Sequence, residues 1–425
     1  MLRGGQSIKI KGQGILQIIF FLTSVFFAGG VFATAYSEST KPPFILETKD
    51  ILPKNQLKGS NYTVNEAVQN DGLVNTYRLT TSYGPLTVES TAELMIKIAE
   101  LNAMNAMTQM DTEKIFGDAV LEGLKAPIRG IEAIVKAPIE TSKGIIKGTG
   151  RFFSNIGRSI VSDDPYQDNT FKVAVGYDAI KRVYAYELGI DVYSDYEGLI
   201  SMLGRVAQAS AAGGIAPRMA MSAINLDVVT VLSLSGTSEG MRKLVRDNPP
   251  GELLKINTEK LAEMGVPSSL AEAFLNNYVD NPQETTFLVG QLASLGGVKG
   301  RAGFIAAANL ASDHSVARLY RIKAEMMAGY HMTVIPVQSI DSAAGTSYLR
   351  KKDGVAILLL PLDYIYPTVD VSAKLAKIDR ALTKDGITGK ELWITGRVDE
   401  SARPLFKDYG WQVVENAYER LMKKK

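Results

Sequence analysis

The sequence predicts an α+β protein built from four successive parts behind an export leader. Three observations predict this class. Residues 60–112 contain short β-rich runs between turn residues, followed by a helix. Helical periodicity dominates residues 169–330. In residues 331–425, strands alternate with helices. The fourth part is an amphipathic segment with eleven-residue repeats, which lies between the first two of these regions. With 425 residues, 46% hydrophobic and 22% charged, the chain has the composition of an ordinary globular protein.

Residues 1–35 have the layout of a secretory signal peptide. Arg3, Lys9 and Lys11 precede an apolar run at 15–33, which ends in an A-x-A site at 33–35 and continues into polar sequence. We therefore expect cleavage after Ala35. The alternative is an uncleaved anchor, because residues 14–35 approach the ~20 residues that cross a bilayer.

Composition limits where the mature chain works and what it binds. The leader holds three of the 47 basic residues and none of the 45 acidic ones, so the mature chain has 44 basic residues against 45 acidic. A balance near zero argues against nucleic acid as a partner. The chain contains no cysteine, which excludes disulfides and thiolate metal sites. Its two histidines are too few to complete a metal site, so we expect no metal or other cofactor. We expect an exported protein of the periplasm or cell envelope.

The first part behind the leader is expected to be a tether followed by a β-meander and a helix. Residues 36–59 contain three prolines and no regular periodicity, which favours a tether. The β-rich runs at 62–68, 73–81 and 86–89 are separated by turn sequences, Asn-Asp-Gly and Ser-Tyr-Gly-Pro. A run of strong helix formers at 92–110 predicts a helix.

Residues 113–161 repeat with a period of eleven. Lys114, Lys125, Lys136, Lys147 and Arg158 are each eleven residues apart, and such a repeat keeps equivalent positions on one face of a helix. Residues 114–160 carry eight basic and four acidic side chains. The residues that we expect at a membrane surface are the apolar side and its basic neighbours: Lys125, Ile128, Arg129, Ile131, Ile134, Val135, Lys136, Ile139, Ile145, Ile146, Lys147, Phe152 and Phe153.

This pattern resembles the eleven-residue amphipathic repeats of lipid-surface proteins such as synucleins, perilipins and exchangeable apolipoproteins. The resemblance implies a helix that lies in the membrane interface, with its apolar side among acyl chains and its basic groups near phosphates. Pro127 and Pro138 depart from it and predict short helices joined by bends. Two alternatives stay open, because the apolar side can also pack on the protein's own body or on another protein.

A turn-rich acidic break at 162–168 leads into a helical middle domain at 169–330. Helices are predicted at 172–187, 195–211, 251–264, 268–277, 283–295 and 315–328. Asn-Pro, Gly-Val-Pro and Gly-Gly sequences separate several of them. No strict repeat links these helices, so we expect a packed domain rather than a solenoid.

One string in this domain suggests catalysis. Residues 236–240 have the G-x-S-x-G form of a nucleophile elbow, with Ser238 as nucleophile and only His314 and His331 available as the base. Such a site would make the protein an esterase-like serine hydrolase. The hydrolase fold requires several parallel strands before the elbow, whereas residues 169–225 are predicted to be helical, so a structural turn is the preferred interpretation.

Residues 331–425 predict a small α/β domain. The β-rich runs lie at 332–340, 355–366, 392–395 and 411–414, and helices are predicted at 371–382, 401–409 and 416–422. The run at 392–395 leads through Gly396 to Asp399, a predicted N-cap, so a ligand can be accommodated at the carboxyl end of this strand.

These features favour a non-enzymatic scaffold or interaction protein that associates peripherally with a membrane. The expected partner is an anionic lipid surface or another protein of the envelope. The serine hydrolase is the alternative function.

Overall fold

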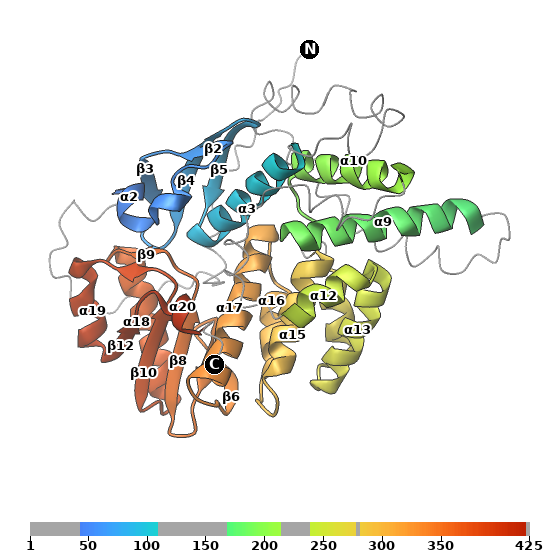
Figure 1. Ribbon diagram of the computed structural model, residues 1–425. Helices are drawn as coiled ribbons and strands as arrows, with labels where there is room; N and C mark the ends of the chain where they lie inside the picture. Colours follow the sequence, from blue (N-terminus) through green and yellow to red (C-terminus); the bar gives the residue numbers. More distant parts are fainter. Residues whose placement is uncertain (1–42, 109–167, 214–238, 278–280, 422–425) are drawn as a thin grey trace, which may run out of the picture.

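The computed structural model describes residues 43–108, 168–213, 239–277 and 281–421 (Figure 1). This part of the chain is mixed α+β, with an N-terminal sheet, a helical middle and a C-terminal α/β region, which confirms the predicted fold class. The leader at 1–35, the repeat segment at 113–161 and Ser238 lie outside the described residues. No helix within the described ranges is long and apolar enough to cross a membrane.

The N-terminal region is an antiparallel sheet with a helix packed on it. Its strands are β1 (Phe44–Glu47), β2 (Tyr62–Val64), β3 (Ala67–Asn70), β4 (Asn75–Thr81) and β5 (Gly84–Glu89). β4 pairs with β5 on one side and with β2 and β3 on the other, and β1 pairs with β3 at the edge. The meander predicted between residues 62 and 89 is therefore present.

Residues 44–56 differ from the predicted tether. They form β1, helix α2 (Thr48–Ile51) and the 3-10 turn η2 (Lys54–Gln56). The sequence lacks a clear signal because β1 is a four-residue edge strand whose side chains alternate between half-buried and exposed. Its order comes from pairing with β3, which local periodicity does not reveal.

Helix α3 (Thr91–Thr108) follows the sheet, as predicted. Ser90 begins it, because its Oγ accepts a hydrogen bond from the Glu93 backbone N–H at 3.1 Å. Leu94, Ile98 and Leu101 follow helical spacing and are buried in the same apolar cluster as the sheet.

The middle of the chain contains eight described helices. They are α9 (Asp168–Leu188), α10 (Glu197–Gly213), α12 (Glu239–Asp247), α13 (Pro250–Glu263), α14 (Ser268–Leu275), α15 (Pro282–Ser294), α16 (Arg301–Ala308) and α17 (His314–Thr333). Six of these match predicted helices within a few residues. The short α12 and α16 were not among them. Helix α17 links the helical region to the C-terminal sheet, because it packs on both α15 and β8 (Val355–Leu360).

The C-terminal region is a mixed sheet flanked by helices. The strand order is β12 (Trp411–Val414), β10 (Gly389–Ile394), β8, β7 (Thr346–Arg350) and β6 (Ser339–Ala343), with β12, β10 and β8 parallel. β9 (Tyr364–Ile365) and β11 (Arg397–Val398) form a separate pair. The helical elements are α18 (Val369–Lys384), η5 (Glu400–Ala402), α19 (Arg403–Asp408) and α20 (Ala417–Leu421).

Two local predictions in this region were wrong. The strand expected at 332–340 begins only at Ser339, because α17 continues to Thr333 and the apolar side chains at 332–335 have no sheet neighbour. β7 was not predicted at all. It forms a hairpin with β6 through Ala344 and Gly345, whose φ angles of 50° and 85° suit a tight two-residue turn.

The helical and C-terminal regions share one hydrophobic core. Phe304 and Met327 from the helices lie in the same buried cluster as Leu359 and Trp393 from the sheet. This shared core fixes the helices against the sheet, so that a cavity at their junction has a defined shape.

Candidate ligand-binding cavity

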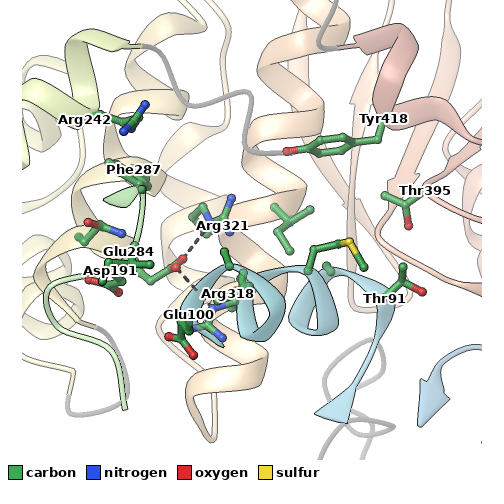
Figure 2. Close-up of a pocket in the computed structure, with 18 of the residues that line it drawn as sticks. Thr91, Glu100, Asp191, Arg242, Glu284, Phe287, Arg318, Arg321, Thr395 and Tyr418 are labelled. Atoms are coloured by element: carbon green, nitrogen blue, oxygen red, sulfur yellow. Dashed lines mark hydrogen bonds and ion pairs between the residues drawn. The ribbon is translucent and has the colours of Figure 1, made fainter. Parts of the chain in front are cut away.

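A cavity of about 310 Å³ lies where the three regions meet (Figure 2). Its walls come from α3, α9, α12, α15 and α17 and from the loops that follow β8, β10 and β12. A volume of this size falls at the lower end of the range for small-molecule sites.

Much of the cavity surface is apolar. Helix α3 contributes Ala92, Met95, Ile96 and Ala99, which recur at helical spacing beside the row that faces the sheet. The remaining apolar wall residues are Ile51, Ala185, Ile190, Val192, Val245, Phe287 and Ile322. Helix α3 is therefore apolar on two faces, one toward the sheet and one toward the cavity.

Ten charged residues also line the cavity, and arginine predominates. They are Arg182, Arg242, Arg246, Arg318, Arg321, Arg397, Glu100, Asp191, Glu284 and Asp363. The six arginines outnumber the four acids, so the pairing of each group decides where positive charge is left uncompensated.

Glu284 on α15 compensates two of the arginines. Its carboxylate lies 2.8 Å from Arg321 Nε and 3.4 Å from Arg318 Nε, both on α17. Arg318 also pairs with Glu93, and Arg321 pairs with Glu325 at 2.7 Å. Burial alone would raise the pKa of the Glu284 carboxyl, but the two arginines outweigh it and lower that pKa.

Asp191 lies beside this group on the loop after α9. Its carboxylate accepts hydrogen bonds from the Asn281 side chain at 2.6 Å and from the Tyr193 backbone N–H at 2.8 Å. Burial, with a contribution from the nearby Glu284 charge, raises the pKa of Asp191 to about 7. Asp191 thus loses much of its negative charge near neutral pH.

Three arginines gather at one end of the cavity, which we call the arginine end and define as Arg182, Arg242 and Arg246. Arg242 donates to the Tyr186 carbonyl at 2.9 Å and pairs with Glu239 at 3.4 Å, and Arg246 pairs with Asp247 at 2.7 Å. Both guanidinium groups lie within 5 Å of the Tyr186 ring centre. Helices α9 and α12 position all three arginines.

Arg182 differs from the other buried arginines of the cavity. It is only 7% exposed, and its Nε donates to the Arg246 carbonyl at 3.1 Å. No carboxylate in the described part of the chain forms an ion pair with it, and its terminal nitrogens have no hydrogen-bond partner there. Arg182 is therefore a largely buried cation without a direct ion pair, although, together with the hydrogen bond from Arg246, its charge helps to lower the pKa of the nearby Asp247 carboxyl.

The opposite end of the cavity, which we call the strand end, is formed by Thr395, Arg397 and Asn416. These residues follow the carboxyl ends of the parallel strands β10 and β12, where open α/β sheets commonly bind ligands. Gly396 allows the close packing here, because a Cβ atom at this position would lie 1.7 Å from the Asp363 carbonyl oxygen. The strand end, where the sequence allows but does not require a ligand, therefore lines the cavity, and Asp399 caps η5 as expected.

The histidines proposed for the hydrolase do not line this cavity. His314 begins α17 directly after Asp313, whose carboxylate accepts a hydrogen bond from the Val316 backbone N–H at 3.0 Å. His331 lies in the last turn of the same helix, and its Nδ1 accepts a hydrogen bond from the Val337 backbone N–H at 3.1 Å. The residues after Ser238 form α12, whose Arg242 lines the cavity, but the cavity contains no histidine to act as a base.

The thirteen residues expected at a membrane surface lie outside the described ranges, so that interpretation stays a prediction.

The sequence did not predict the arginine end. The available signal was weak: Arg242 and Arg246 are one turn apart on a nine-residue helix, and Arg318 and Arg321 are three residues apart on α17.

Within the described ranges, no group of three or more acidic or histidine side chains is arranged to hold a metal ion. No family model matches the sequence, and no curated protein or solved structure matches it either.

Proposed function

We propose that this chain is an exported, non-enzymatic binding protein that holds a single-chain amphiphilic anion in its central cavity. Arg182 carries the proposal. Arg182 lines the cavity, and its terminal nitrogens form neither an ion pair nor a hydrogen bond within the described residues, so they can bind an anionic group that enters the cavity. An anionic ligand group at the arginine end supplies the missing partner.

The apolar wall specifies the rest of the ligand. Met95, Ile96, Phe287 and Ile322 line the cavity, and their side chains offer no hydrogen-bonding groups. An alkyl chain gains about 25 cal/mol for each Å² of apolar surface that it removes from water there. The ligand class is therefore an alkyl chain with a carboxylate or phosphate head group.

The position of the predicted membrane segment supports a ligand of lipid origin. Helix α3 ends at Thr108 and α9 begins at Asp168, so the chain between them connects two elements that both line the cavity. If residues 113–161 lie on an anionic membrane, as the sequence predicts, the cavity walls are tethered at both sides to that surface. This arrangement keeps the cavity close to a source of amphiphiles.

Calorimetric titration of the mature protein with dodecanoate, dodecyl phosphate and dodecanol tests the proposal. The two anions should bind and dodecanol should bind at least tenfold more weakly, because a charge-assisted hydrogen bond contributes about 1.5–3 kcal/mol. The stronger of the two anions identifies the head group. The proposal fails if dodecanol binds as well as the anions or if none of the three binds.

A variant tests whether Arg182 itself, rather than the overall charge of the protein, binds the anion. Arg182→Gln should weaken anion binding by at least tenfold without lowering the melting temperature, because Arg182 forms no ion pair within the described residues. The matched control is Arg380→Gln on the exposed face of α18, which should leave binding unchanged. Equal losses in both variants would show that overall charge, rather than Arg182, attracts the ligand.

A further inference from the structure

The strand end differs chemically from the arginine end. Thr395 Oγ1 donates to the Leu362 carbonyl at 2.8 Å and keeps its lone pairs as acceptors. The Asn416 side chain has no hydrogen-bond partner and Arg397 has no ion-pair partner within the described residues. The strand end therefore offers both donors and acceptors that the protein itself does not use.

Asn416 adds a conformational indication. Its φ angle is 50°, a left-handed conformation that costs a non-glycine residue energy and that asparagine tolerates better than most. Such residues concentrate at functional sites, where the backbone conformation positions a side chain. Asn416 is exposed, and its backbone N–H donates to the Gly396 carbonyl at 2.9 Å, which holds its side chain beside the cavity within reach of solvent and ligand.

The strand end also contains a carboxylate. Asp363 faces the same end, and its carboxylate accepts hydrogen bonds from the backbone N–H groups of Asn75 at 2.9 Å and Thr91 at 3.0 Å. Burial raises the pKa of this carboxyl to about 6, so it is largely ionised at neutral pH, and Arg397 is exposed, so solvent screens its charge. A second anionic group would therefore gain little here, whereas a neutral group that both donates and accepts can use Thr395 and Asn416.

The two ends lie on opposite sides of the cavity. In Figure 2, Arg242 and Thr395 lie on opposite sides, with Arg321 between them. A ligand whose head group binds at the arginine end, beside Arg242, thus directs the far end of its chain toward Thr395.

We infer that the strand end is a second subsite that recognises a hydroxyl group at the far end of the ligand chain. The ligand class becomes an ω-hydroxy alkyl anion rather than a simple fatty acid. This inference rests on the proposed function, because the arginine end must hold the head group for the chain to reach Thr395.

Calorimetric titration with dodecanoate, ω-hydroxydodecanoate and dodecanedioate, together with shorter and longer homologues of each, tests the inference. At the best chain length, the hydroxy acid should bind about three- to tenfold more tightly than the simple acid, as expected for one added hydrogen bond. The diacid should bind no more tightly than the hydroxy acid. Equal affinity for the simple and hydroxy acids at every length, or tightest binding of the diacid, would overturn the inference. If none of the acids binds, the proposed function itself fails.

Two variants assign the effect to the strand end. Thr395→Val keeps the side-chain shape, and Asn416→Gly keeps the left-handed backbone while removing the amide. Each should reduce the preference for the hydroxy acid over dodecanoate to near unity. The matched control is Thr383→Val on α18, whose hydroxyl also donates to a backbone carbonyl, at 2.9 Å, but lies outside the cavity. A preference that survives both cavity variants would contradict the inference.

Discussion

Glu284 and Arg321 form an ion pair at 2.8 Å in which both side chains are almost fully buried, at 11% and 7% exposure. The pair joins α15 to α17 beside the cavity. Glu284→Ala should lower the free energy of unfolding by about 3–5 kcal/mol, because it leaves Arg318 and Arg321 each short of a buried counter-charge. Urea denaturation followed by circular dichroism measures the change.

An exposed pair provides the control for this loss. Glu252 and Lys255 on α13 lie 3.0 Å apart with 45% and 63% exposure. Glu252→Ala should cost less than about 1 kcal/mol, because solvent screens the pair. If the two variants lose the same free energy of unfolding, the Glu284 pair is not a principal contact between α15 and α17.

Asp191 makes the stability of the protein depend on pH. Burial raises its pKa to about 7, against a usual value near 4, so the folded state favours the protonated form. Its contribution to stability is therefore fully present below about pH 4 and is lost as pH rises through about 7. Asp191→Asn mimics the protonated group at every pH.

The difference between the two proteins gives the measurement. Between about pH 5 and about pH 8, the free energy of unfolding of Asp191→Asn should rise by about 2–4 kcal/mol relative to that of wild type. This gain corresponds to the pKa change of this one group. Thermal unfolding of both proteins at several pH values records the gain and cancels the contributions of all other titrating groups. A difference that stays constant with pH would mean that Asp191 keeps its ordinary pKa.

Local periodicity was enough to predict most of the fold. The row of Leu94, Ile98 and Leu101 identified α3, and the turn around Gly72 marked the meander. The failures are physical. β1 depends on a distant partner strand, and the apolar residues at 332–335 imitate a strand although α17 extends into them.

The cavity was harder to predict, because its residues come from parts of the chain that are far apart. Arg182 and Thr395 are more than two hundred positions apart in the sequence, and neither belongs to a recognisable motif. The carboxyl end of β10 could be foreseen, since parallel strands bind ligands at that edge. The arginine end could not, because an arginine on an amphipathic helix usually faces solvent and only the packing of α9 against α12 turns it inward.

The membrane association of residues 113–161 is open to a direct test in the whole protein. Ile134 and Ile145 are on the predicted apolar side, eleven residues apart. The double variant Ile134→Glu with Ile145→Glu should release the protein from anionic vesicles, since a charge replaces apolar contact at two points and the new carboxylates are repelled by anionic lipid. Vesicle sedimentation at low and high salt measures the release, and wild-type binding should weaken as salt rises.

Melting temperature distinguishes this outcome from unfolding. If the apolar side contacts lipid, the double variant should melt within a few degrees of wild type, because surface substitutions usually change stability by no more than about 0.5 kcal/mol. If the same side packs on the protein's own body, two buried glutamates should cost several kcal/mol and the fold should be lost. Val369→Glu, at a position that is 75% exposed and outside this segment, controls for the added negative charge. It should leave both vesicle binding and melting temperature unchanged, so that a loss of binding in the double variant with a retained fold identifies residues 113–161 as the membrane contact.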